Sequence, residues 1–166
     1  VTANLALNRA DTLNGSAGND LINSAGGEDF IVAKEGDDWV KAGTERDRVS
    51  GGAGIDLIEG GSGADIFAGN DDIDQLFGNG QVSISAAIAS GNTDAGSDLQ
   101  GDWLNGGGGN DVAIAGADND VLFGGAGQDL LIGGAGDDVI DGDDGYTATS
   151  FDWTVTDYGN PFDRRF

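Results

Sequence analysis

The sequence predicts an all-β chain, folded as a right-handed parallel β-roll (a β-solenoid) of stacked 18-residue coils with an irregular insertion and an aromatic C-terminal cap. The main observation is a nine-residue unit, present in four consecutive copies from Gly106 to Asp141. Glycine is the usual residue at its first, second and fourth places. Aspartate occupies the sixth place in all four copies, and the eighth place is apolar. The composition agrees, because the chain has 32 Gly and no Cys, so no disulfide framework stabilises it.

Each unit divides into a turn and a strand. Three glycines within six residues suit a backbone that visits positive φ and passes close to other atoms, so the first six places are predicted as a turn. The last three places are predicted as a short strand, in which the eighth side chain faces one way and the seventh and ninth face the other. Two units therefore make one coil, and stacked coils bury the eighth-place side chains between two parallel sheets.

The N-terminal part of the chain keeps this period. Residues 6–14 form a degenerate unit without a glycine turn, predicted as an opening coil or the tail of a preceding coil. Seven regular units follow from Gly15 to Phe77, so residues 1–77 are predicted as a first β-roll block. The eighth places of these units are all apolar, a regularity that chance seldom produces. They are Ile22, Ile31, Val40, Val49, Ile58, Phe67 and Leu76.

The period breaks at residues 78–101. Asp102 follows Asp74 at an interval that is not a multiple of nine, so this segment is predicted as an insertion that loops from one face while the roll continues. Its opening part alternates enough for a strand and is alanine-rich enough for a short helix. Residues 102–145 are predicted as a second β-roll block. The aromatic residues of 146–166 predict a tail that covers the open end of the roll, or the start of a next domain.

Stacked turns bring sixth-place aspartates together from successive coils, and such like charges repel one another. A hard cation between coils relieves this repulsion, since Ca²⁺ accepts six to eight carboxylate and carbonyl oxygens, whereas the absence of His and Cys disfavours softer metals. We therefore expect multiple calcium ions, about nine, one for each aspartate pair. These pairs are Asp11/Asp29, Asp29/Asp47, Asp47/Asp65, Asp20/Asp38, Asp38/Asp56, Asp56/Asp74, Asp102/Asp120, Asp120/Asp138 and Asp111/Asp129.

Two units depart from the pattern. They contain four of the seven basic residues of the chain, Lys34, Lys41, Arg46 and Arg48, and Glu45 replaces a fourth-place glycine. A positive side chain could take the role of a missing ion, in which case calcium is weakest or absent at these turns. The alternative is that these residues form solvated ion pairs on the outer surface.

The tandem Gly-Gly-x-Gly-x-Asp units resemble those of the repeats-in-toxin (RTX) family, over roughly two thirds of the chain. The resemblance implies that carbonyl oxygens of the first and third places of successive turns bind each ion together with both sixth-place carboxylates. It also implies structural rather than catalytic calcium. On the five complete units these carbonyls belong to Gly51, Ala53, Gly60, Ser62, Gly106, Gly108, Gly124, Ala126, Gly133 and Ala135.

The composition argues against several classes of function. The formal net charge of −23 argues against nucleic acid, and without metal the chain approaches the composition of disordered proteins. The absence of His and Cys excludes Ser-His-Asp triads and cysteine nucleophiles, so no enzyme activity is expected. No membrane span is apparent. Calcium is abundant outside cells, which favours a secreted or cell-surface location.

The resemblance therefore predicts a calcium-binding, calcium-induced folding module of a secreted bacterial RTX-type protein, with a structural or type I secretion role. Two alternatives are an adhesion or self-assembly module of the surface-layer kind and a non-catalytic appendage of a secreted enzyme or toxin. Apolar residues on the outward places of both sheets suggest that at least one sheet is covered, by the tail from Tyr146, by residues 82–89, by another copy or by the rest of a larger chain.

Overall fold

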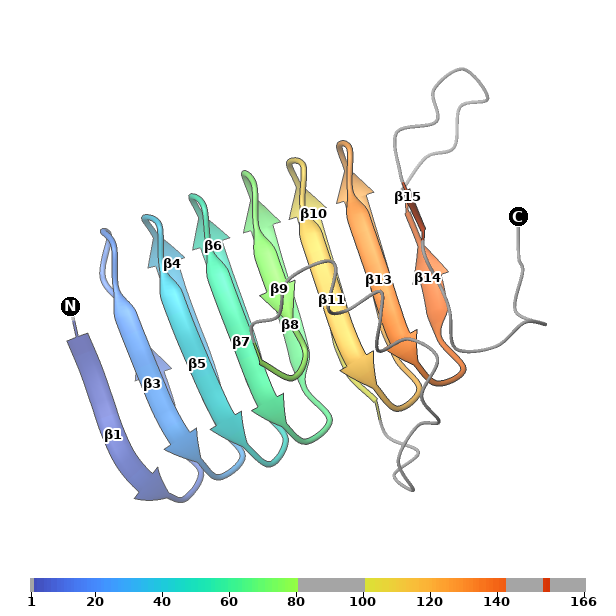
Figure 1. Cartoon of the computed structure of the whole chain (residues 1–166). Coiled ribbons are helices and arrows are strands. Elements are labelled where there is room, and N and C mark those ends of the chain that lie inside the picture. The colour runs from blue at the N-terminus through green and yellow to red at the C-terminus, as the bar shows by residue number, and fades with distance from the viewer. Residues whose placement is uncertain (1, 81–100, 143–153, 156–166) are drawn as a thin grey trace.

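The structure is a computed structural model that describes residues 2–80, 101–142 and 154–155 (Figure 1). These residues form 15 strands and no helix, so they contain no helix that could cross a membrane. The strands lie in two parallel sheets (Figure 1). One sheet contains β1 (Thr2–Asn8), β3 (Leu21–Gly26), β5 (Trp39–Thr44), β7 (Leu57–Ser62), β9 (Gln75–Phe77), β11 (Val112–Ala117), β13 (Leu130–Ala135) and β15 (Thr154–Val155). The other contains β2 (Thr12–Asn14), β4 (Phe30–Glu35), β6 (Arg48–Ala53), β8 (Ile66–Asp71), β10 (Trp103–Gly108), β12 (Val121–Ala126) and β14 (Val139–Asp141).

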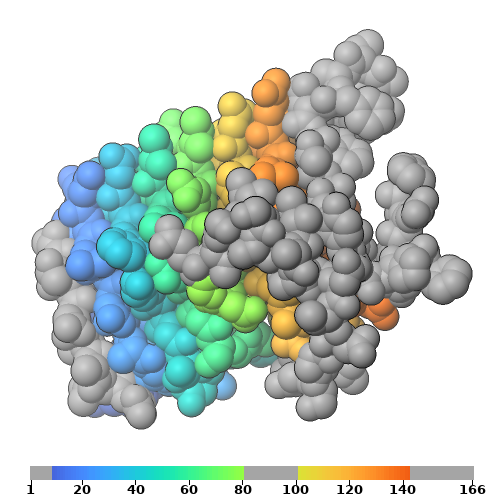
Figure 2. Space-filling view, in the orientation of Figure 1, coloured from blue at the N-terminus to red at the C-terminus, as the bar shows by residue number. Residues whose placement is uncertain are grey.

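Each coil contributes one strand to each sheet. Val40 of β5 lies opposite Ile58 of β7, and Ile31 of β4 lies opposite Val49 of β6, so aligned residues are one coil apart. The space-filling view shows the described coils following one another along the molecule in sequence order (Figure 2). The predicted parallel β-roll of stacked two-unit coils is therefore confirmed.

The strands are longer than the pattern predicted. We expected three-residue strands, whereas β7 and β12 each span six residues and continue through the first three places of the next unit. The expectation was wrong because these glycine-rich places also pair between coils, as Gly43 does with Gly61. Gly61 has φ +115°, which bends the strand toward the turn without removing it from the sheet. The turn is thereby reduced to the fourth to sixth places.

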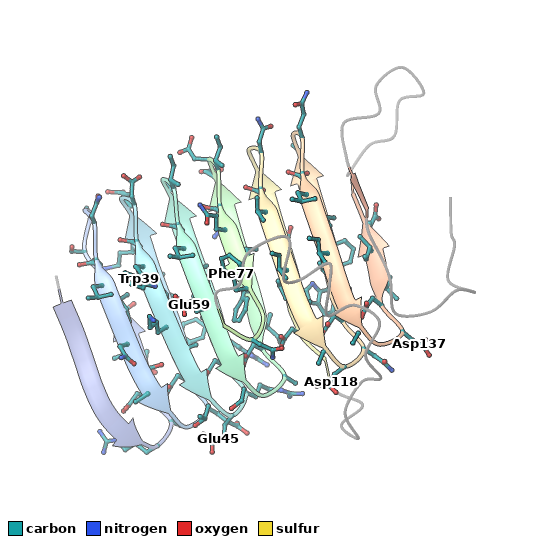
Figure 3. The ribbon with its side chains drawn as sticks, viewed as in Figure 1. Trp39, Glu45, Glu59, Phe77, Asp118 and Asp137 are labelled. Carbon is teal, nitrogen blue, oxygen red and sulfur yellow. The ribbon has the colours of Figure 1, made fainter. Side chains whose placement is uncertain are left out.

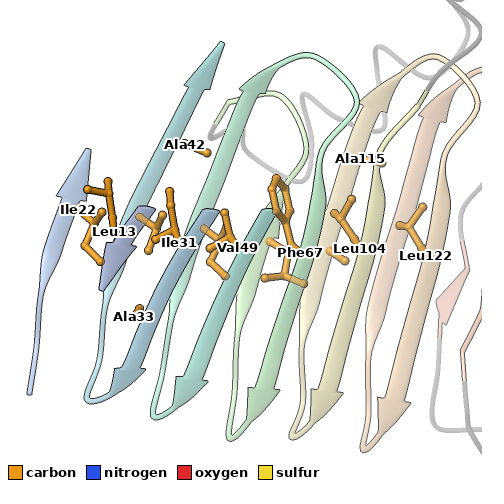
Figure 4. Packing of buried hydrophobic residues seen from close by; sticks show 14 of the residues in the cluster. Leu13, Ile22, Ile31, Ala33, Ala42, Val49, Phe67, Leu104, Ala115 and Leu122 are labelled. Atoms are coloured by element: carbon orange, nitrogen blue, oxygen red, sulfur yellow. The ribbon is translucent and has the colours of Figure 1, made fainter. Parts of the chain in front are cut away.

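The core is the column of eighth-place side chains between the sheets, with the small first-place residues Ala33, Ala42 and Ala115 packed beside it (Figure 4). Ile58 is fully buried and Phe67, the largest member, is 1% exposed. The column continues through Leu104 and Leu122 to Leu131, so the two predicted blocks share one core. Because each coil adds only two such side chains, the apolar area buried per residue is small.

The insertion leaves the register of both sheets intact. Trp103 of β10 lies opposite Ile66 of β8, and Val112 of β11 lies opposite Gln75 of β9. The change of phase in the sequence is therefore absorbed before Asp102, and the roll continues past the insertion as predicted. Most of the insertion, including residues 82–89, lies outside the described residues, and the division of the chain into domains stays a prediction.

Both ends of the chain contribute to the sheets. The degenerate first unit supplies β2, which lies beside β4, and the end of β1, while the residues before this unit supply the start of β1 beside β3. At the other end, Thr154 and Val155 form β15 beside β13. The aromatic residues of the predicted cap lie outside the described residues.

The outer faces of the two sheets differ in exposure. On the eight-stranded sheet, Phe77, Ile114 and Ile132 are at most 4% exposed and form a second apolar cluster. On the seven-stranded sheet, Phe30 and Trp103 are each 49% exposed. Shielding is thus limited to the part of the eight-stranded sheet around β9, β11 and β13, because Leu21 and Trp39 on β3 and β5 of the same sheet are each 40% exposed.

We predict that this second cluster contributes to the stability of the single chain. Ile132→Ala should lower the free energy of unfolding by about 2–4 kcal/mol, because a buried side chain is truncated. Ile66→Ala is the matched control: Ile66 faces outward on the other sheet, is 37% exposed and should cost less than about 1 kcal/mol. Urea denaturation of calcium-saturated protein, with light scattering to follow association, measures both. Equal losses for the two variants would contradict the prediction.

Candidate metal centres

The sixth-place aspartates line the two edges of the roll. Each one directly precedes a strand, as Asp47 precedes β6 and Asp56 precedes β7. Apart from Asp11, which is partly exposed, they are buried in the turns, with exposed fractions from 0% at Asp47 and Asp74 to 4% at Asp20 and Asp129. Carboxylates are seldom buried this fully unless charged or hydrogen-bonding partners compensate them.

One carboxylate oxygen of each turn holds the preceding coil. The backbone N–H of Asp38 donates to Oδ1 of Asp56 at 2.9 Å, and the same bond recurs along both edges. All nine aspartate pairs predicted from the sequence are joined in this way. One edge carries Asp11, Asp29, Asp47, Asp65, Asp102, Asp120 and Asp138, and the other carries Asp20, Asp38, Asp56, Asp74, Asp111 and Asp129.

The second carboxylate oxygen is the unsatisfied group. In many of these turns Oδ2 is buried and accepts no hydrogen bond. A buried carboxylate oxygen without a donor is costly, so it requires either a proton or a cation. The turns concerned are those of Asp29, Asp38, Asp47, Asp56, Asp65, Asp74, Asp102, Asp111 and Asp120.

Where the first place is glycine, a carbonyl oxygen of the next coil lies beside the carboxylate. A methyl group added to Gly51 would meet Oδ2 of Asp56 and, at 3.0 Å, the carbonyl oxygen of Gly69. Glycine at the first place therefore leaves room for a carboxylate and a carbonyl from successive coils to approach each other. The same arrangement occurs at Gly60 with Asp65 and Gly78, at Gly106 with Asp111 and Gly124, and at Gly124 with Asp129 and Gly142, and Gly133 contacts Asp138.

The third-place carbonyls lie in the strands. The carbonyl oxygens of Ala53 and Ala126 accept backbone N–H groups of the preceding coil, from Gly36 and Gly109, at 2.8 Å. A carbonyl oxygen has a second lone pair, so this bond leaves room for an ion. The remaining third-place residues pair between coils: Ser62 with Thr44, Gly108 with Ala126 and Ala135 with Ala117. Their role as ligands stays a prediction.

Burial shifts the protonation of the aspartates. Loss of solvation raises the pKa of Asp47, Asp74 and Asp102 to about 7 and that of Asp120 to about 8. The N–H bond from the preceding coil lowers each pKa, and neighbouring carboxylates raise it further. Similar causes raise the pKa of Asp56, Asp65 and Asp111 to about 6.

These groups fit calcium. Within the described residues, no three acidic side chains converge as a metal-binding group, so backbone carbonyls would have to complete any coordination shell. Ca²⁺ accepts such mixed sets of carboxylate and carbonyl oxygens, and a divalent charge offsets the repulsion along each edge. Asp56 of one turn and the Gly69 carbonyl of the next supply one oxygen of each kind.

The basic residues of the irregular units have different surroundings. Lys41 lies on the outer sheet surface, 3.4 Å from Glu59 and 4.8 Å from the centre of the Trp39 ring. Figure 3 labels these two partners, Trp39 and Glu59. This is the surface ion pair of the second alternative. Lys34 instead donates to the carbonyl oxygen of Gly15 at 2.6 Å. Glu45 accepts the backbone N–H of Gly27 at 2.8 Å.

Two inter-coil hydrogen bonds and one buried carboxylate oxygen were not predicted from the sequence. Across the insertion, the backbone N–H of Asp65 donates to Oδ1 of Asp102 at 2.8 Å, and that of Asp74 donates to Oδ1 of Asp111 at 2.7 Å. The signal was present, because a glycine and an aspartate resume the unit at residues 101–102. Asp118 stands at a fourth place with φ +85° and has a buried Oδ1 that accepts no hydrogen bond. An acidic residue at a glycine place could have drawn attention to it.

Comparison with known families agrees with this geometry. The family model described as the RTX calcium-binding nonapeptide repeat matches four times, at residues 6–40, 41–80, 98–131 and 114–146. Together these segments cover most of the chain. No curated protein and no solved structure matches it.

We predict that metal-free protein is stabilised by acid. The folded-state pKa values of about 6–8 lie above the value of about 4 for an unfolded aspartate, so the native state binds more protons. The stability that these protonated groups contribute to the metal-free fold is therefore fully present below about pH 4. It is lost as the pH rises through about 6–8. Metal-free protein should therefore show more strand signal by far-UV circular dichroism at pH 5 than at pH 8. Calcium affinity should change in the opposite direction, because ligands must be deprotonated. A metal-free strand signal that rises with pH would refute this assignment.

Proposed function

Because the chain belongs to the RTX calcium-binding nonapeptide repeat family, we propose that it is a structural module whose β-roll folds when calcium occupies both aspartate edges. The observation that carries the proposal is the repeated carboxylate with one oxygen bonded to the preceding coil and the other buried without a donor. A calcium ion at each turn would satisfy that second oxygen and the adjacent first-place carbonyl. The proposed ligands are the sixth-place aspartates and the first- and third-place carbonyls named above.

Charge explains why folding would depend on the metal. The formal net charge is −23, and about nine divalent ions would neutralise most of it. Each ion that binds only the folded state stabilises that state by RT ln(1 + [Ca²⁺]/Kd), so several weak sites together make folding steep in calcium. The small core of each coil cannot offset the conformational entropy of a glycine-rich chain by itself.

A calcium-dependent fold suits a secreted bacterial protein. Calcium is scarce in the cytosol and abundant outside, so the chain would stay unfolded before export and fold afterwards. This is the structural and secretion role that we propose. The absence of Cys is in keeping with it, because the ions would take over the stabilising role that disulfides have in many secreted domains.

A second candidate function is adhesion or self-assembly. Its supporting observation is the exposed apolar column of the seven-stranded sheet, with Phe30, Trp103 and Val139 each at least 49% exposed. Exposed apolar surface of this kind is typical of contact sites. The ring of Phe123 lies 5.7 Å from that of Trp103 and extends the column. Light scattering of calcium-saturated protein tests this candidate, because a strictly monomeric protein would not support it.

We predict that calcium induces the β-structure. Far-UV circular dichroism of the chain with excess chelator should show little strand signal, and millimolar Ca²⁺ should restore it. Magnesium at the same concentration is the control, since its demand for near-ideal octahedral geometry and retained water suits these turns poorly. Full strand signal in chelator would disprove calcium-coupled folding.

We also predict that one isosteric change has opposite effects with and without calcium. Asp56→Asn removes the charge at the unsatisfied oxygen and offers an N–H toward the Gly69 carbonyl, so it should stabilise the metal-free fold. In calcium titrations, loss of a ligand charge should raise the calcium concentration at the folding midpoint by about tenfold or more.

The control is Asp37→Asn, which removes the same charge from the same edge. Asp37 is exposed, and its two oxygens already accept hydrogen bonds from the Ile55 N–H at 3.0 Å and the Asn19 amide at 3.4 Å. It should leave the calcium midpoint nearly unchanged. If both variants shift the midpoint equally, net charge and not coordination at Asp56 controls folding.

A further inference from the structure

The turn that ends at Asp102 is assembled from two parts of the chain that are distant in sequence. Asp102 takes the sixth place, because its Oδ1 accepts the Asp65 N–H at 2.8 Å. Gly78 takes the first place, because its carbonyl oxygen accepts the Gly61 N–H at 2.9 Å and lies beside Oδ2 of Asp65. Residues from before and after 81–100 therefore meet in one turn of the roll.

This turn and the next one on the same edge form one of the proposed calcium positions. A methyl group added to Gly78 would meet Oδ2 of Asp102 and the carbonyl oxygen of Ala115, the first-place residue of the next turn. Asp102 is 3% exposed, and its Oδ2 accepts no hydrogen bond. Asp120, the sixth-place residue of the next turn, is 1% exposed and also has an unsatisfied Oδ2. Two buried carboxylates and a carbonyl oxygen therefore line this position.

Asp118 brings a third carboxylate to the same turn (Figure 3). It stands at the fourth place, two residues before Asp120, where complete units have glycine, and its φ is +85°. Its Oδ1 is buried and accepts no hydrogen bond. Loss of solvation is the largest cause that raises the pKa of Asp102 and of Asp120, and the negative charge of Asp118 raises both pKa values further. Asp118 is therefore close enough to act on both carboxylates.

Two other acidic residues at fourth places have different surroundings. The carboxylate of Glu45 accepts the Gly27 N–H at 2.8 Å and the Thr44 hydroxyl at 2.6 Å. Asp72 is exposed to solvent. Asp118 instead keeps a buried oxygen without a donor, beside two further carboxylates that also have one. Such an accumulation of negative charge is unfavourable by itself, so it indicates a cation.

We propose that Asp118 determines the affinity of the calcium position between Asp102 and Asp120, by supplying that position with a third carboxylate. The inference rests on the proposed function and deepens it, because more carboxylate charge at a site raises its affinity for calcium. No three acidic side chains of the described residues gather around one point, so Asp118 acts from beside the pair. Because Gly78 and Asp102 share one turn, tighter binding here also holds together the parts of the roll before and after residues 81–100.

The test is hydrogen exchange with mass spectrometry on the full chain in millimolar Ca²⁺. Asp118→Asn keeps the shape of the side chain and removes its charge. Exchange in β10 and β12 should become about tenfold faster, the low end for loss of a group that acts beside metal ligands, while exchange in β4 and β6 should not change. Raising the calcium concentration about tenfold should restore the wild-type rate, because occupancy of the position follows mass action.

Asp118→Gly separates a calcium role from a structural one. It restores the glycine of the complete unit and relieves the unfavourable φ, so a structural effect alone would slow exchange. The proposal requires faster exchange that added calcium reverses. Asp137→Asn is the matched control: Asp137 is exposed on the next turn of the same edge, where its N–H donates to Asn119 at 2.9 Å. It should leave exchange in β10 and β12 unchanged.

Four results would overturn the inference. Unchanged exchange in Asp118→Asn would mean that this carboxylate does not act on the position. Equal acceleration in Asp137→Asn would mean that any lost charge on this edge has the effect. Acceleration that added calcium does not reverse, or slower exchange in Asp118→Gly, would make the role of Asp118 purely structural. Wild-type exchange that is independent of calcium throughout the roll would instead refute the proposed function.

Discussion

The structure depends on a carboxylate that is buried once in every turn. Asp56 shows the constraint: one oxygen accepts the N–H of Asp38, which fixes the distance between coils, and the other is buried without a donor. The first bond makes stacking specific, while the second oxygen makes it unfavourable unless positive charge is present. The same side chain therefore aligns the coils and makes their stability conditional on a cation or a proton.

The apolar core is too small to determine by itself whether the coils stack. Ile58 and Phe67 fill the space between the sheets, but each coil offers only two such side chains for eighteen ordered residues. Burial of this size does not offset the entropy of ordering so many glycines. Electrostatic satisfaction at the edges thus decides whether the stack forms, and the core decides which faces of the strands point inward.

Sequence periodicity could predict the features that repeat. The eighth-place residues from Ile22 to Leu76 and the nine aspartate pairs follow from a constant interval, so their places in the fold were accessible. Features that interrupt the interval were not. The link from Asp74 to Asp111 depends on where the roll resumes after the insertion. The contact of Lys34 with Gly15 depends on the reach of a flexible side chain, and the six-residue strands depend on glycines pairing where glycine usually marks a turn.

Because the register is unbroken around the insertion, the architecture of the roll does not depend on the length of the segment between its blocks. Ile66 and Trp103 are neighbours in the sheet although 37 residues separate the aspartates that precede them. Because the entropy of closing a loop grows only slowly with loop length, this connection can lengthen or shorten at little cost to the sheets. The roll is therefore a scaffold that can accept connections of different length between two coils, while every stacked coil keeps a fixed spacing.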